Sequence, residues 1–167
     1  MSNKVSFFII IGSFILQPFL VALLPTWLVP NLMFCILMIM AATMHPEDMV
    51  APMILIFVLT LIQDIYYSQY VGVSVIALLI SMLIVIWIRR LANIENILFV
   101  GLIVVVANLA YAFVYWGIYA ILSSPYSFLY MLTRLPQAII ANIVIMFIAL
   151  FIITRDLIQR RRNEYFR

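Results

Sequence analysis

Charged side chains are scarce in this sequence, where Asp, Glu, Lys and Arg together make up only 9% of 167 residues. Water-soluble domains usually carry about 25% charged residues and bury their apolar side chains in a core whose size is limited by chain length. Here 68% of the residues are hydrophobic and the mean hydropathy is +1.26. Because a soluble domain of this length cannot hide so much apolar surface, the composition predicts an all-α integral membrane protein.

The sequence also lacks the residues from which most catalytic and metal sites are built. It contains one cysteine, Cys35, inside an apolar run, and one histidine, His45, which shares a short polar break with Glu47 and Asp48. A single cysteine excludes an intrachain disulfide, and one residue of each type excludes a metal site made of several His and Cys ligands. No G-x-S-x-G, H-E-x-x-H or glycine-rich phosphate-binding motif occurs. We therefore expect no enzymatic activity, no metal and no cofactor.

Long apolar runs fill most of the chain. A membrane helix needs roughly 20 residues, so six crossings leave room for one transmembrane domain covering residues 1–167 and for little else. Proline and polar breaks place these spans at about 5–24, 28–44, 49–63, 71–88, 97–122 and 136–154. Pro52 and Pro136 then lie near the starts of the third and sixth spans, where the missing N–H does no harm. Because the second and third spans are short, a shallow hairpin that does not fully cross is an alternative for that pair.

The basic residues predict the orientation of the six-helix bundle. One side carries Lys4, Arg89, Arg90 and the arginines of the C-terminal segment, whereas the other side carries only Arg134. The excess of basic residues in cytoplasmic loops predicts that both termini are cytoplasmic. Basic residues beside membrane spans do not form a nucleic-acid patch. We expect four of them to anchor the topology and attract anionic lipid, namely Arg155, Arg160, Arg161 and Arg162.

Asp64, at the outer end of the third span, is a functional candidate because ionisable groups are rare at membrane depth. Two structural roles are the alternatives: a cap for the following segment, or an ion pair with Arg134 on the same side. In the first span, Pro18 should bend the helix and free backbone groups that the neighbouring Gln17 could satisfy.

The fifth span carries a polar and aromatic stripe of Asn108, Tyr111, Tyr115 and Tyr119. Spacings of three and four residues place these side chains on one face of a helix. The stripe is either a docking face or pocket for a partner, or packing material inside the bundle with Asn108 hydrogen-bonded there.

Three short segments carry a recognisable pattern of residues. In residues 60–74, Asp64 ends an apolar helix, a short polar turn follows, and Gly72 lies eight residues after the Asp. This pattern resembles the rod shape-determining protein family MreD. Residues 29–32, Val-Pro-Asn-Leu, are similar to the family's Pro-acidic-apolar opening of the second span, with Asn31 in place of the acid. Leu-Pro-Gln at 135–137, followed by Asn142, is similar to the opening of its last span.

The resemblance implies a non-enzymatic scaffold in the bacterial inner membrane that maintains rod shape as part of the cell-wall elongation complex. Implied partners are MreC, MreB, and RodA with its penicillin-binding transpeptidase. The implied fold is similar to the substrate-binding subunits of energy-coupling-factor transporters. Partner contacts are expected at the Asn108–Tyr119 face and at the turn between Asp64 and Gly72.

Three other functions are weighed against the scaffold. A vitamin-binding subunit of an energy-coupling-factor transporter commonly carries an Ala-x-x-x-Ala pair on its first helix, but residues 5–21 contain no alanine. A channel or proton relay needs ionisable residues near the membrane midplane, and only Asp64 comes near. An outer cleft could also bind a lipid head group, with Asp64, Arg134, Tyr126 and Tyr130 at its rim.

Overall fold

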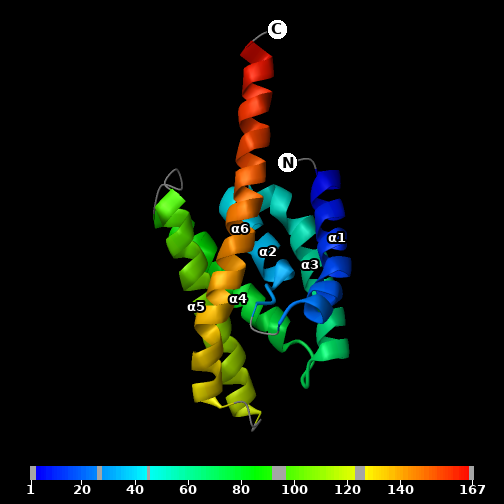
Figure 1. Cartoon of the computed structure of the whole chain (residues 1–167), viewed down its shortest axis with the longest axis vertical. Coiled ribbons are helices and arrows are strands. Elements are labelled where there is room, and N and C mark those ends of the chain that lie inside the picture. The colour runs from blue at the N-terminus through cyan, green and yellow to red at the C-terminus, as the bar shows by residue number, and fades with distance from the viewer. Residues whose placement is uncertain (1–2, 26–27, 45, 92–96, 123–126, 166–167) are drawn as a thin grey trace.

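The computed structural model describes residues 3–25, 28–44, 46–91, 97–122 and 127–165. These residues form a bundle of α-helices (Figure 1). In chain order the helices are α1 (Asn3–Leu23), α2 (Leu32–Thr43), α3 (Pro46–Tyr67), α4 (Val73–Leu91), α5 (Ile97–Ile121) and α6 (Phe128–Tyr165).

Five of these helices are long and apolar enough to cross a membrane, and α2 is the exception. The protein is therefore a multi-pass helical membrane protein. The predicted span at 28–44 contains a helix of only 12 residues, preceded by non-helical backbone. The predicted span at 49–63 is too short, because α3 has 22 residues. For this pair a shallow hairpin was the alternative to two spans, and only α2 is too short to cross.

Two prolines expected near helix starts lie well inside helices. Pro52 lies inside α3, and Pro136 lies inside α6, which begins eight residues earlier, at Phe128. Proline is tolerated inside membrane helices because neighbouring groups satisfy the backbone that it frees. With 38 residues, α6 is about 57 Å long at 1.5 Å per residue, and it continues beyond the rest of the bundle (Figure 1).

The bundle has two distinct ends (Figure 1). We call the end where α1 begins and α6 leaves the bundle the terminal end, and the opposite end, where α3 turns into α4, the distal end. Helices α1, α3 and α5 run from the terminal to the distal end, and α2, α4 and α6 run back.

The short helix α2 forms the centre of the bundle. It contacts α1, α3, α4 and α6, and its side chains from Leu32 to Ala42 are buried, apart from the partly buried Ile36. A helix that is apolar on all sides is expected in such a central position. The remaining packing joins α4 to α5, α5 to α6, α1 to α3, and α3 to α4.

Candidate functional site

The backbone at the start of α2 enters the bundle from the distal end and is held there by side chains of other helices. The Asn31 N–H donates to Oδ1 of Asn142 in α6 at 2.9 Å, and the Leu32 N–H donates to Oε1 of Gln17 in α1, also at 2.9 Å. Asn31 is the N-cap and accepts from the Phe34 N–H at 3.0 Å. The first N–H groups of a helix have no partner within the helix, and lipid offers them none. These contacts therefore allow α2 to begin inside the membrane domain.

Gln17 binds the incoming segment through both ends of its amide. Its Nε2 donates to the Pro30 carbonyl at 3.0 Å, while its Oε1 accepts from Leu32. We expected Gln17 to satisfy backbone freed by Pro18 in its own helix. Its partners instead lie 13 and 15 residues further along the chain.

A second amide pair joins α5 to α6. Asn142 Nδ2 donates to Asn108 Oδ1 at 2.7 Å, and Asn108 Nδ2 donates to the Val104 carbonyl of its own helix at 2.9 Å. Both asparagines are buried. Asn108 lies 11 residues into the 25-residue α5, so this pair lies about midway along that helix. Four amide side chains therefore surround the start of α2 or join the helices beside it: Gln17, Asn31, Asn108 and Asn142.

The other end of α2 is held by an arginine. Arg89, in the last turn of α4, donates through Nη1 to the carbonyls of Met44 at 2.6 Å and Ala41 at 3.1 Å. A cation near a helix C-terminus is favourable, and these carbonyls lack partners within the helix. Arg89 was expected only to set the orientation; it also fixes α2 from the terminal end.

Asp64 caps the start of α4. Its Oδ2 accepts from the backbone N–H groups of Gly72 and Ser74, both at 3.0 Å, and its Oδ1 accepts from the Ser68 hydroxyl at 3.1 Å. The carboxylate is buried, with 2% exposure, and it lies at a helix N-terminus, where negative charge is stabilised. Gly72 has φ +89°, a left-handed conformation that favours glycine. The eight-residue spacing of Asp64 and Gly72 is thus the spacing of a tight capped turn.

The ion pair expected between Asp64 and Arg134 does not form between these two described residues. The carboxylate of Asp64 is engaged in the turn before α4, and the Arg134 guanidinium lies over the Tyr130 ring, 5.3 Å from its centroid. The two residues also line different cavities. The pair was expected only because both residues lie on the same predicted side of the membrane, and a shared side does not determine which helices are neighbours.

The tyrosines of α5 lie on one face and point into the bundle. The Tyr111 and Tyr115 rings stack at 5.9 Å between centroids, and Tyr115 and Tyr119 at 4.7 Å. Tyr111 meets the edge of Phe34 in α2, and Tyr119 meets Tyr70 of the turn before α4. This face therefore contacts other parts of the same chain.

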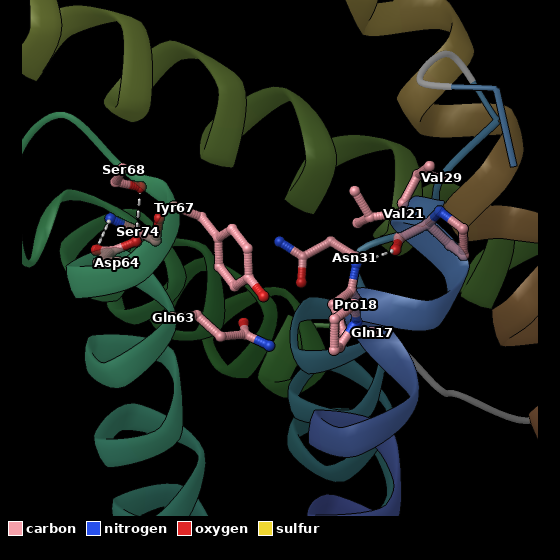
Figure 2. Close-up of a pocket in the computed structure, with 11 residues that line it drawn as sticks. Gln17, Pro18, Val21, Val29, Asn31, Gln63, Asp64, Tyr67, Ser68 and Ser74 are labelled. Carbon is pink, nitrogen blue, oxygen red and sulfur yellow. Dashed lines mark hydrogen bonds between the residues drawn. The ribbon is translucent and has the colours of Figure 1, made fainter. Parts of the chain in front are cut away.

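Two cavities lie on either side of the segment that enters α2, and Val29 and Asn31 line both. The first, of about 220 Å³, lies between α1, that segment and the α3–α4 turn. In Figure 2 the side chains of Asn31, Gln63 and Tyr67 point toward one another in this cavity, whereas Asp64 is turned toward Ser68 and Ser74. The second, of about 190 Å³, lies between the same segment, α5 and α6.

Some predicted site residues lie outside what the structure describes. This applies to the side chains of Arg155, Arg160, Arg161 and Arg162, whose backbone belongs to α6, and to Tyr126. Among the described residues, no three His, Cys, Asp or Glu side chains come together in a metal-binding group.

Comparison of the chain with protein-family models, with curated proteins and with solved structures finds no match in any of the three.

Proposed function

We propose that this chain is an MreD-like scaffold: a non-enzymatic component of the cell-wall elongation complex in the bacterial inner membrane, with both termini cytoplasmic. Its proposed partners are MreC, MreB, and RodA with its penicillin-binding transpeptidase. In this orientation the terminal end faces the cytoplasm, and the distal end, with the Asp64 turn and both cavities, faces outward.

One observation carries the proposal: all three segments of the resemblance supply residues that bind the start of a helix. Asp64 and Gly72 form the capped turn before α4. Asn31 caps α2, and Asn142 holds the backbone of Asn31. Asn and Asp are about equally good N-caps, so Asn31 can do what the acid does at the corresponding family position. The residues that support the resemblance therefore belong to two sets of contacts that fix the starts of α4 and α2, which is the expected pattern if the chain shares the family's fold.

These contacts change the way in which the predicted partner residues contribute to partner binding. Asp64, Asn108 and Tyr119 are buried, and the contacts of Gly72 are those of the turn. In the proposed scaffold these residues act by fixing the relative positions of the helices. Partner proteins then bind the surface that the helices present to lipid. Mutation of the buried residues weakens assembly indirectly, through the positions of the helices.

The test is to purify a tagged copy from its native membranes in mild detergent and to identify the co-purifying proteins by mass spectrometry. We expect MreC and the elongation enzymes, in excess over a tagged multi-pass protein of similar size used as the control. Depletion of the protein should also make rod-shaped cells round. Normal rods after depletion, together with no enrichment of MreC, would remove the proposal.

A transporter subunit of similar fold is the second candidate, and the two cavities at the distal end favour it. The same purification separates the two functions. Recovery of paired ATPases and a coupling membrane subunit, in place of MreC, would identify the transporter subunit.

A further inference from the structure

The second cavity is lined by a cation, Arg134, that forms no ion pair with any of the described residues. Its walls come from the segment that enters α2, from α5 and from α6, and they include Tyr111, Tyr115, Ala138 and Arg134. Arg134 is partly buried in the second turn of α6. The volume of about 190 Å³ is several times the ~30 Å³ that a water molecule occupies in the liquid, so it has room for a compact polar group.

The protein does not neutralise this arginine from within the described residues. The ring of Tyr130 lies under its guanidinium, but no acceptor among these residues takes a hydrogen bond from it. Asp64 is the acidic residue described at the distal end, and it is committed to the N-terminus of α4. A partly desolvated guanidinium is stabilised by an anion that accepts its N–H bonds. That anion must therefore come from outside the described fold.

The position of the cavity indicates the kind of anion. Arg134 lies six residues after the start of α6 at Phe128, at the distal end of the bundle, where we expect the head groups of the surrounding leaflet. On the same face of α6, one turn before and one turn after Arg134, Tyr130 and Ala138 are exposed, so an acyl chain can lie beside the cavity. The planar fork of an arginine matches the oxygens of a phosphate group, and a lipid supplies that phosphate at this depth.

We propose that the Arg134 cavity binds the phosphate group of an anionic membrane lipid. This inference does not depend on the scaffold function, since it uses only the cavity, the charge and its depth. It replaces the head-group cleft expected from the sequence, in which Asp64 and Arg134 shared one rim, with a site that contains Arg134 alone.

The experiment is native mass spectrometry of the full chain in detergent with two added probes: dioleoyl phosphatidylglycerol and dioleoylglycerol. They share their acyl chains and differ in the anionic phosphoglycerol head group. We expect retention of phosphatidylglycerol alone, reduced about tenfold by Arg134→Gln, as the loss of one charge-assisted contact predicts. Arg90→Gln, which removes an exposed positive charge from the terminal end, is the matched control and should change retention less than about twofold.

A second variant and a competitor complete the test. Ala138→Phe fills the cavity and keeps Arg134, so it should also reduce retention, which covers the case in which Arg134→Gln does not fold. An excess of inorganic phosphate that displaces the lipid would assign the site to a soluble phosphate; failure to displace it would assign the site to the lipid. Equal retention of both probes, or equal losses with Arg134→Gln and Arg90→Gln, would overturn the proposal.

Discussion

Gln17 and Leu32 are joined across two helices by a 2.9 Å hydrogen bond, in which the first N–H of α2 donates to a side chain of α1. The same amide also donates to the carbonyl of Pro30. One uncharged side chain thus satisfies a donor and an acceptor of a backbone segment that enters an apolar bundle. This relationship lets α2 begin inside the bundle, whereas its composition predicted a span or one half of a shallow hairpin.

Replacement of Gln17 by Leu should destabilise the bundle. It leaves the Pro30 carbonyl and the Leu32 N–H without their partners, and we expect a loss of about 2 kcal/mol in the free energy of unfolding. Titration of SDS into mixed micelles, followed by circular dichroism, measures this change. Gln63→Leu is the control: Gln63 lines the adjacent cavity, and its side chain makes no hydrogen bond within the described residues. Similar losses for the two variants would show that the backbone contacts of Gln17 are unimportant.

Replacement of Asp64 by Ala should be among the most damaging changes at the distal end. It removes the acceptor of three hydrogen bonds and the negative charge at the start of α4. We expect a loss of about 3 kcal/mol in the same unfolding measurement, and a smaller loss for Asp64→Asn, which keeps one acceptor oxygen. Glu47→Ala, at an exposed acid in the first turn of α3, should lose less than about 1 kcal/mol. A neutral Asp64→Ala would contradict the capping role.

Gly72→Ala tests the backbone of the same turn. A Cβ at this position meets only Leu61 Cδ1, at 3.9 Å, so there is space for it. The expected loss of about 1–2 kcal/mol comes from the left-handed φ of +89° alone. Gly117→Ala is the matched control, because Gly117 lies inside α5 with no atom within 4 Å of an added Cβ, and it should be neutral or slightly stabilising. Equal effects at both glycines would remove the argument from backbone conformation.

The apolar runs were enough to predict a helical membrane bundle, but they did not predict its centre. Residues 28–44 have the apolar composition of a span, and composition does not show that the first four residues are not helical. The contacts that hold α2 join residues up to 111 positions apart, and no local periodicity records such pairs. The sequence did contain a signal for these contacts. Four isolated amide side chains lie in apolar surroundings, each on a different element: Gln17, Asn31, Asn108 and Asn142. Amides in such positions need partners, and the most economical partners are one another and the end of a helix.

Asp64 is a second residue whose role could not be predicted from the sequence alone. Its depth marked it as unusual, and a cap and an ion pair were both compatible with the sequence. The choice depended on whether the turn at Gly72 brings two N–H groups to the carboxylate, which is a matter of three-dimensional geometry.

Arg89 and Arg90 should differ, although they are adjacent and have the same charge. Arg89 donates to two carbonyls at the end of α2, whereas Arg90 is exposed. Arg89→Leu should therefore lower the free energy of unfolding by about 2 kcal/mol, and Arg90→Leu by much less. Each variant removes one basic residue from the last turn of α4, so any effect on membrane orientation is shared. Equal stabilities would show that Arg89 serves only the topology.

The Asn108–Asn142 bond can be measured by a double-mutant cycle of leucine substitutions. Asn142→Leu should be the more damaging single change, because Asn142 also accepts the N–H of Asn31, whereas the second bond of Asn108 goes to its own helix. Interhelical bonds of this kind in membranes average about 0.6 kcal/mol and reach about 1.7. Because this bond is short, at 2.7 Å, and fully buried, we expect a coupling of about 1 kcal/mol in the free energy of unfolding. The double variant should therefore be less damaging than the two single losses combined. Additive losses would mean that the two amides stabilise α2 and α5 separately and that α5 and α6 are held together by apolar packing alone.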